Sequence, residues 1–523
     1  MPSLGLLVRT LSQYDPGQLV NYAARRMARP KVDNRPAPPL RTRGGAFVHP
    51  ILRPYYETQA GSFRLLNLEY SVTGAKPWHP EAPMLWLYTL HYHEALSATG
   101  HSAQQQAFIS HWIATNPPPA GVGWHPYPIS LRVVQWIKWL MRGETPPDGM
   151  IHSLATQVRY LTQILETHLG ANHYFSNAVA LSAAGFFFGG EEAESWRRTG
   201  FAILTREFPK QYLADGAHFE LSASYHGLLL ESILDLENIA NAYGWDAGRP
   251  WRQALPRARH WMALMTRPDG GYPQFNDCAR SAAPAPGIID AYARAIGLPE
   301  ADQAVPGMND MAESGYSRFD AARYTAFADS GRFGPRTQPG HGHCDMLSFE
   351  LSVDGKLIFS NTGTSTYDRN AIRMAERSTV AHNTVQVGQS EQTEIWAAFR
   401  AGRKAHITGR RVEADGVSAA HDGYRPLGIS HNRHFQFAAD SITIRDELIG
   451  RRLPATSRLH LAPGIVPVTD GADIVAGPVR ISAPGATVRI ADYEFAEDFN
   501  LRVPAKVIEL GFTGKLETRI LLT

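Results

Sequence analysis

The chain has 523 residues, with 51 Lys and Arg against 49 Asp and Glu and a formal net charge of +2. This balance, without long runs of one sign, gives no indication of a nucleic acid or membrane-surface partner. Its two cysteines, Cys278 and Cys344, exclude a disulfide framework and a thiolate zinc cluster. The length exceeds that of most single cores and predicts two domains.

The N-terminal segment lacks the pattern of an export signal. Its apolar patch from Leu4 to Val8 is interrupted by Arg9, and is shorter than the ~7–15 apolar residues of a signal peptide. No stretch reaches the ~20 apolar residues that span a bilayer. We therefore expect a cytoplasmic protein without a membrane span, and the sequence leaves its oligomeric state open.

Residues 1–310 predict an all-helical domain. Apolar residues recur at helical spacing in blocks separated by Gly and Pro, among them ISLRVVQWIKWLMRG, IHSLATQVRYLTQILETHLG, FSNAVALSAAGFFFGG and SYHGLLLESILDLENIANAYG. Successive helical hairpins without a recognisable repeat indicate an α/α toroid, or incomplete barrel.

Residues 311–523 predict an antiparallel β-sandwich. The segment LSFELSVDGKLIF alternates apolar and polar residues and turns at Asp354-Gly355, a favoured hairpin dipeptide. Alternation continues in HNTVQV, RHFQFAADSITIRDE, SRLHLAP, GATVRI and KLETRILL, with Gly, Pro and Asp between them. Helices followed by strands predict an α+β multidomain protein.

Three places in the helical half carry polar residues beside expected helix starts. In GWHPYPISLRVVQW a Trp-His-Pro-Tyr loop leads into a helix, where Ser130 could simply be the cap. In GANHYFSNA, Asn172 and His173 lie between two helices, and Asn172 could equally form a turn. In DGAHFELSASYH a polar loop precedes a helix that opens with Tyr225 and His226.

Tyr225 shares a helical face with leucine and isoleucine residues, so we expect its ring against the core and its hydroxyl at the helix start. A buried structural tyrosine is the alternative. Helix ends of a toroid would bring these aromatic, amide, imidazole and phenol groups into one cleft, which suits a carbohydrate.

The loop GHGHCD places His341, His343 and Asp345 between glycines, directly before the predicted hairpin. Residue types alone allow a metal site, a catalytic acid–base set or a polar loop that caps the sheet. The sequence pattern does not choose among these three.

Six motifs occur in order between residues 80 and 405: LWLYTLHYHEAL, GWHPYPISLRVVQW, GANHYFSNAVAL, DGAHFELSASYH, GHGHCDMLSFELSVDGKLIFSNTGTSTYD and RSTVAHNTVQVGQSEQTEIWAAFRAGRKA. Together they resemble the successive motifs of the heparinase II/III-like polysaccharide lyases. The resemblance implies an α/α toroid followed by an antiparallel β-sandwich. It also implies cleavage of an acidic, uronic-acid-containing poly- or oligosaccharide by β-elimination, without a required cofactor.

The resemblance also implies roles for individual residues. Asn172 would hydrogen-bond the uronate carboxyl, with His173 beside it. Tyr225 would protonate the leaving group and could also be the base, and His341 would be the catalytic histidine of the β-domain.

His343 and His382 match positions that bind a structural zinc, together with an aspartate, in some family members. This chain has Asn361 at the third position, and asparagine brings no charge and only a weak carbonyl donor. The alternative is that the two histidines hydrogen-bond within the sandwich. Asp345 is expected to be a loop group or to lie behind the ligands.

Further substrate contacts are expected from both domains, through arginines for carboxylate or sulfate and aromatic rings for sugar faces. The candidates are Trp124, His125, Tyr127, Arg132, Glu220, Arg373 and Arg377.

Two other classes of function fit the same helical architecture. A glycoside hydrolase would need two carboxylates, which could come from Asp215, Glu220, Glu231 and Asp277. A non-catalytic glycan-binding protein of polysaccharide assembly would keep Trp124 and Arg132 but would not need Tyr225 together with His341.

Overall fold

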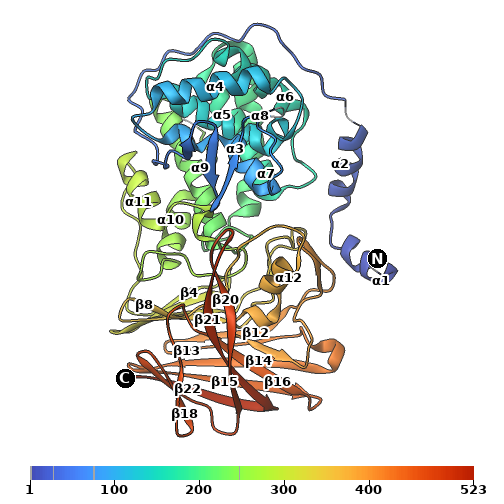
Figure 1. Cartoon of the computed structure of the whole chain (residues 1–523), viewed down its shortest axis with the longest axis vertical. Helices are drawn as coiled ribbons and strands as arrows, with labels where there is room; N and C mark the ends of the chain where they lie inside the picture. Colours follow the sequence, from blue (N-terminus) through green and yellow to red (C-terminus); the bar gives the residue numbers. More distant parts are fainter. Residues whose placement is uncertain (1–2, 28, 75–76, 247) are drawn as a thin grey trace.

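The computed structural model describes residues 1–523 except 1–2, 28, 75–76 and 247, and shows a helical domain above a β-domain (Figure 1). The last helix of the first domain, α11 (Pro286–Ala295), is followed by strand β4 (Gly307–Met311). The change from helices to strands therefore lies shortly before the predicted boundary at residue 310. None of the described helices combines the length and the apolar composition needed to cross a membrane.

Helices α3 to α10 form most of the first domain and pack as successive hairpins around a large apolar core. Their bounds are α3 (Met84–Tyr92), α4 (Ser102–Thr115), α5 (Pro126–Met141), α6 (Met150–Gln163), α7 (Ala171–Phe187), α8 (Gly190–Gln211), α9 (Ala223–Ala242) and α10 (Leu255–Leu264). Helix α6 ends at Gln163, whereas the apolar pattern predicts a longer helix. Residues 164–170 form a loop instead.

The all-helical expectation for residues 1–310 is wrong in one place. A three-stranded sheet, β1 (Glu57–Gln59), β2 (Ser62–Leu65) and β3 (Leu68–Ser71), precedes α3. Leu66 and Asn67 both have positive φ, at 51° and 62°, which is the conformation of a two-residue hairpin turn. Strands of three or four residues are too short for the alternation to be recognised in the sequence.

The β-domain contains a five-stranded, an eight-stranded and a four-stranded antiparallel sheet. The five-stranded sheet comprises β4, β5 (Tyr316–Asp320), β6 (Tyr324–Asp329), β7 (Phe349–Val353) and β8 (Lys356–Phe359). The eight-stranded sheet comprises β12 (Ile407–Glu413), β13 (Gly416–His421), β14 (Ile429–Phe437), β15 (Ser441–Gly450), β17 (Val468–Asp470), β18 (Asp473–Ala476), β19 (Val479–Ser482) and β22 (Lys515–Leu522). The four-stranded sheet comprises β9 (Val385–Val387), β16 (Pro454–His460), β20 (Thr487–Asp498) and β21 (Leu501–Thr513). Two further strands, β10 (Ile395–Ala397) and β11 (Arg400–Ala401), form a hairpin, and one helix, α12 (Ala371–Arg377), interrupts the strands.

The five-stranded sheet connects the two domains. Phe349 of β7 lies against Phe435 of the eight-stranded sheet, with ring centroids 5.9 Å apart. On the opposite face, the Glu350 carboxylate accepts the Gln274 backbone N–H at 3.0 Å from the helical domain. Both faces of β7 are therefore buried. The predicted turn is confirmed, since Asp354 and Gly355 follow β7 with positive φ.

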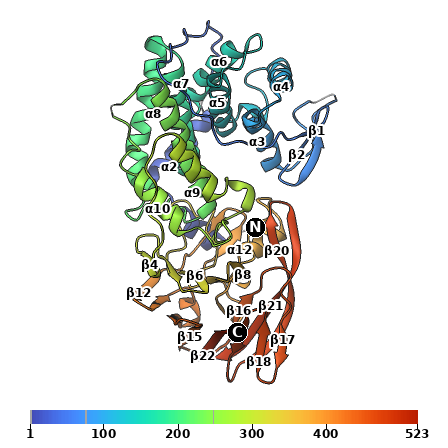
Figure 2. The same cartoon turned by 90° about the vertical axis from the view of Figure 1, so that its left-hand side faces the viewer.

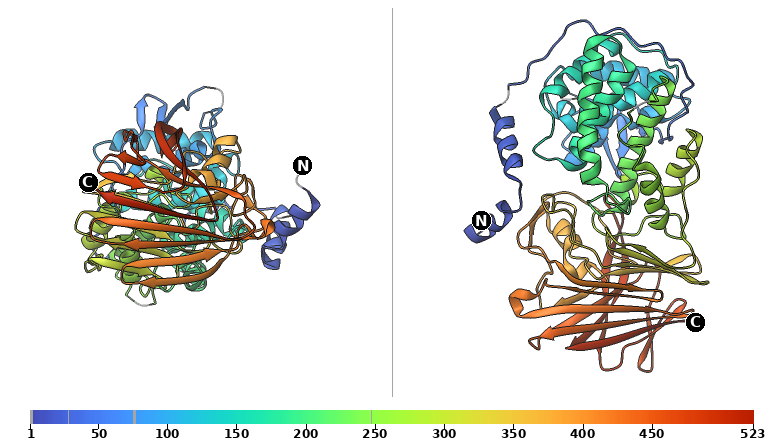
Figure 3. Two further views of the ribbon diagram at one scale, coloured as in Figure 1. Left: turned by 90° about the horizontal axis from the view of Figure 1, so that it is seen from below. Right: turned by 180° about the vertical axis from the view of Figure 1, so that it is seen from behind.

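Two contacts at opposite ends of the chain also bridge the domains. The β20–β21 hairpin reaches from the sandwich to the helical domain (Figure 2), where Asn67 donates to the Phe499 carbonyl at 2.9 Å. Helices α1 (Leu4–Leu11) and α2 (Pro16–Met27) lie along the outside of both domains on another flank (Figure 3).

Candidate active site

The candidate site lies where helix starts of the toroid face the loop between β6 and β7. Asn172 and His173 are in the first turn of α7, and Tyr225 is in the first turn of α9. The Ser222 side chain caps α9 by accepting the Tyr225 backbone N–H at 3.3 Å. A cap of this kind fixes the first turn, and so fixes where the Tyr225 ring leaves the helix.

Tyr225 and His341 come from different domains and are in contact. Their ring centroids are 4.3 Å apart. Nε2 of His341 lies 4.0 Å from Oε2 of Glu220, which is on the loop before α9. A phenol, an imidazole and a carboxyl group therefore meet where the two domains face each other, at a place that we call the cleft.

Asp277 orients the His341 ring. Nδ1 of His341 donates to one Asp277 oxygen at 2.7 Å, and Nε2 of His343 donates to the other at 2.7 Å. Arg373 binds both oxygens of this carboxylate from the other side. Burial alone would raise the pKa of Asp277, but the Arg373 guanidinium and the two imidazoles hold that pKa well below its usual range. With Nδ1–H committed to a carboxylate, Nε2 is the His341 nitrogen left for the cleft.

The Tyr225 hydroxyl donates a hydrogen bond to the Tyr367 hydroxyl at 3.0 Å. Burial, together with the nearby Tyr367 and Asp277, raises the pKa of Tyr225 well above its ordinary value. The Tyr225 phenol is thus protonated at neutral pH. A protonated phenol in a cleft can supply a proton to a departing oxygen.

Glu220 and the start of α7 form the opposite side of the cleft. Glu220 is 1% exposed, and its Oε2 has no hydrogen-bond partner among the described residues. Burial raises the pKa of Glu220, against the effect of His341, His173 and the Asn172 backbone N–H. A buried carboxyl group with a free oxygen can hydrogen-bond an incoming polar ligand.

His173 is held by a carboxylate that sequence reasoning missed. Its Nδ1 lies 3.0 Å from Oε1 of Glu166, in the loop that replaces the end of the expected α6. Burial of the ring opposes charge, but Glu166 raises the pKa of His173 overall. The charged form of His173, beside Asn172, therefore persists to higher pH than that of an ordinary histidine.

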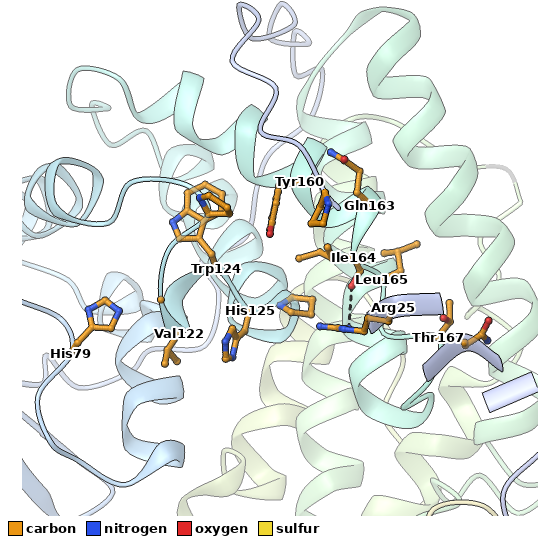
Figure 4. Close-up of a pocket in the computed structure, with 15 residues that line it drawn as sticks. Arg25, His79, Val122, Trp124, His125, Tyr160, Gln163, Ile164, Leu165 and Thr167 are labelled. Atoms are coloured by element: carbon orange, nitrogen blue, oxygen red, sulfur yellow. Dashed lines mark hydrogen bonds between the residues drawn. The ribbon is translucent and has the colours of Figure 1, made fainter. Parts of the chain in front are cut away.

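The predicted aromatic contacts lie on one side of this cleft. The Tyr127 ring is 4.3 Å from the His173 ring between centroids. Trp124 and His125 line a neighbouring cavity of about 630 Å³, together with Tyr160 (Figure 4). Trp124 is only 4% exposed, so it offers little surface to this cavity.

The three arginines predicted to contact substrate are fully buried. Their guanidinium groups bind other parts of the protein instead. Arg132 donates to Gln157 and to the His91 and Gly123 carbonyls inside the helical core. Arg377 donates to backbone carbonyls of the loop that carries His341. Arg373 binds Asp277, donates to the Gly340 carbonyl at 3.2 Å and lies 5.0 Å from the centroid of the Tyr367 ring. Their donors are engaged within the protein, so these arginines position the cleft and do not reach a ligand in it.

Asp277 and Tyr367 were also missed as partners of the site. In the sequence, Asp277 is a candidate only for a hydrolase acid, because the loop around it has turn residues but no chemical motif. Tyr367 lies inside the motif that carries His341, so that motif was a signal for it. Asp345 is a loop group, as expected, and accepts the Asn276 backbone N–H at 2.7 Å.

The residues of the predicted zinc set do not fit a zinc ion. His343 and His382 are neighbours, with ring centroids 5.3 Å apart, and Nδ1 of His343 and both ring nitrogens of His382 lack partners among the described residues. Asn361 uses its side-chain oxygen to accept the Asn383 N–H at 3.1 Å, which leaves only an NH₂ group unpaired. No cluster of three or more His, Cys, Asp or Glu is arranged to hold a metal in the described ranges. A zinc ligand set needs a further donor.

We expect that dialysed protein holds clearly less than one zinc per chain, and that Asn361→Asp raises the zinc content because a carboxylate joins the two imidazoles. Elemental analysis of both proteins measures this, with Asn361→Ala as the control that adds no ligand. One tightly held zinc per wild-type chain contradicts the expectation.

The fold and the cleft together define a two-domain protein of the toroid-and-sandwich class. Family comparison agrees with this, since residues 86–293 match "Heparinase II/III N-terminus" and residues 303–521 match "Heparinase II/III-like, C-terminal". The chain therefore belongs to the heparinase II/III-like family.

Individual relatives are distant. A heparin-sulfate lyase of Bacteroides stercoris is 25% identical over 303 residues, which is 53% of this chain and 45% of that protein. FtsZ-localized protein C of Caulobacter vibrioides is 25% identical over 350 residues, 60% of this chain and 57% of that protein. The crystal structure of a heparinase III has a TM-score of 0.70 at 19% identity, covering 87% of this chain and 80% of the other. The chain thus matches only about half the length of these sequence relatives, and the structural likeness shows the fold.

Proposed function

We propose that this protein is a polysaccharide lyase that cleaves a uronic-acid-containing poly- or oligosaccharide by β-elimination. The observation that carries the proposal is the contact between Tyr225 and His341, next to Glu220, which also interacts with His173 and the Asn172 backbone N–H. The lyase names among the relatives support the same reaction class.

The reaction removes the proton on carbon 5 of a uronate, breaks the bond between carbon 4 and the leaving oxygen, and forms a double bond between carbons 4 and 5. Asn172 hydrogen-bonds the uronate carboxyl group, beside Glu220, whose pKa burial raises, and His173, whose pKa Glu166 raises, stabilises the negative charge that develops there. Nε2 of His341 accepts the carbon 5 proton. Tyr225 gives its proton to the leaving oxygen and afterwards regains one from His341, which restores both groups.

The hydrolase alternative is less well supported. Of the four candidate carboxylates, Asp277 is saturated by Arg373 and two histidines, and Glu231 pairs with Arg53 at 2.6 Å. Asp215 accepts the Ser314 N–H at 2.7 Å. The other three carboxylates are therefore engaged, and Glu220 has no free carboxylate to act with. A hydrolase needs such a pair across the scissile bond. A glycan-binding protein would not require the Tyr225 and His341 contact.

A substrate screen tests the proposal. Purified protein is incubated with heparan sulfate, hyaluronan, chondroitin, alginate and bacterial exopolysaccharides, and the ultraviolet absorbance of unsaturated uronate is followed. We expect a rise with at least one polymer. New reducing ends without this absorbance would indicate hydrolysis, and binding by calorimetry without any product would indicate a glycan-binding protein. The expected cytoplasmic location stays a prediction.

A further inference from the structure

Helix α1 turns its apolar face away from the protein. Leu4, Leu7, Val8 and Leu11 form one stripe at helical spacing and are 79%, 38%, 58% and 53% exposed. The opposite face is the one that docks: Arg9 pairs with Glu394 at 2.6 Å, and Trp396 donates to the Thr10 hydroxyl at 3.1 Å. An amphipathic helix normally buries its apolar face, so this orientation is the reverse of ordinary packing.

Helix α2 repeats the arrangement. Arg25 donates to the Ile164 carbonyl at 3.4 Å on the side of the helical domain. Val20 and Met27, two turns apart on another side, are 67% and 74% exposed. Figure 3 shows that both helices project from the same flank of the molecule. Two neighbouring helices thus leave apolar side chains in water at the same edge of the protein.

The same segment carries an excess of positive charge. Residues 3–35 contain six Arg or Lys against two Asp. Both aspartates are engaged, Asp15 by Arg336 and Asp33 by Arg35.

Three cations of the segment are left over. Arg26, Arg29 and Lys31 are exposed and have no acidic partner within the part of the chain that the structure describes. Arg26 lies within α2, next to Met27, and Arg29 and Lys31 follow the end of the helix. Free cations beside exposed apolar side chains are the combination that binds a bilayer with anionic headgroups.

We propose that α1, α2 and residues 29–31 form a docking surface for a membrane rich in anionic phospholipid. The apolar stripes enter the boundary between headgroups and acyl chains, and the cations contact the phosphate groups. The surface lies outside the cleft, so the proposal does not depend on the lyase activity.

A second copy of the chain fits this surface less well. A two-fold contact that pairs the surface with itself would bring the unpaired cations of one copy close to those of the other.

Cosedimentation of the full chain with vesicles tests the proposal. One set of vesicles contains phosphatidylcholine and phosphatidylglycerol in equal parts, and the other contains phosphatidylcholine alone. We expect the wild-type protein to sediment with the mixed vesicles at low salt, and to be released as salt screens the charges.

Two variants separate the contributions, and a third is the control. Leu7→Gln/Val8→Gln/Leu11→Gln should weaken binding by at least about tenfold through lost apolar insertion. Arg26→Gln/Arg29→Gln/Lys31→Gln should weaken binding to the mixed vesicles by on the order of a hundredfold. Val466→Gln/Val468→Gln changes apolar residues that are 66% and 61% exposed on the β-domain, and should bind as wild type. All substituted side chains are exposed, and melting curves confirm that each variant is folded.

The proposal is overturned if the wild-type protein stays in the supernatant with the mixed vesicles at low salt, or if the Leu7, Val8 and Leu11 variant sediments like wild type. Gel filtration without vesicles tests whether the surface binds a second copy of the chain instead. A wild-type dimer that this variant converts to a monomer, without vesicle binding, would assign the surface to a second copy and reject the lipid.

Discussion

Tyr225→Phe should reduce turnover by about 10²–10⁴-fold, because the leaving oxygen would depart without a positioned proton donor. The change removes one oxygen and keeps the ring. Its structural cost is the hydrogen bond from Tyr225 to Tyr367, worth about 1 kcal/mol. Turnover on the best substrate from the screen and the melting temperature are measured together, and we expect the first to fall steeply and the second to change little.

Tyr324→Phe is the matched control for this experiment. The Tyr324 hydroxyl donates to the Ala438 carbonyl at 2.6 Å, far from the cleft in the β-domain. Its loss should cost a similar stability and leave turnover intact. Retention of more than about a tenth of wild-type turnover by Tyr225→Phe would be a smaller loss than acid–base groups usually cause. That result would exclude Tyr225 as the proton donor and assign this role to His341 or His173.

His341→Ala should cause a loss of the same order, about 10²–10⁴-fold in turnover, because it removes the nitrogen that accepts the carbon 5 proton. Asp277 keeps its bonds to Arg373 and His343, so we expect a loss of about 1.5–3 kcal/mol from the charged hydrogen bond and no unfolding. Asn172→Ala, measured beside it, should weaken stabilisation of the uronate carboxyl and lower turnover without removing a proton-transfer group.

His406→Ala is the control, since His406 is an exposed histidine of the same domain. It should change neither turnover nor melting temperature. A His341→Ala protein that is folded and turns over substrate like wild type would contradict the role of His341 as the base.

Local patterns were sufficient for most of the fold. The helix through Tyr225 and the hairpin at Asp354-Gly355 depend on neighbouring residues, so spacing and turn chemistry predicted both. The small sheet at residues 57–71 was missed because its strands are too short to show a period. The end of α6 at Gln163 was missed because the apolar pattern continues into the following loop.

The site was predicted less evenly. Asn172, His173, Tyr225 and His341 stand in recognisable motifs, and the structure brings them to one cleft, where their roles stay predictions. Asp277 and Glu166 each lie in a loop, without a pattern of their own, and become partners of the two histidines only when distant segments meet. Arg132, Arg373 and Arg377 stand in the same motifs, yet their guanidinium groups point into the protein.

The sequence by itself determined the fold class, with helices before strands, and it indicated the residues that we propose carry the chemistry. These features follow from local spacing and from motifs that each occupy a short segment. Only the tertiary structure decided which nitrogen of His341 faces the cleft, which arginines are buried, and that the apolar stripe of α1 faces outward. Burial and pairing between residues such as Asp277 and His341 depend on segments far apart in the chain, and an overall charge of +2 does not show that one short segment is strongly basic.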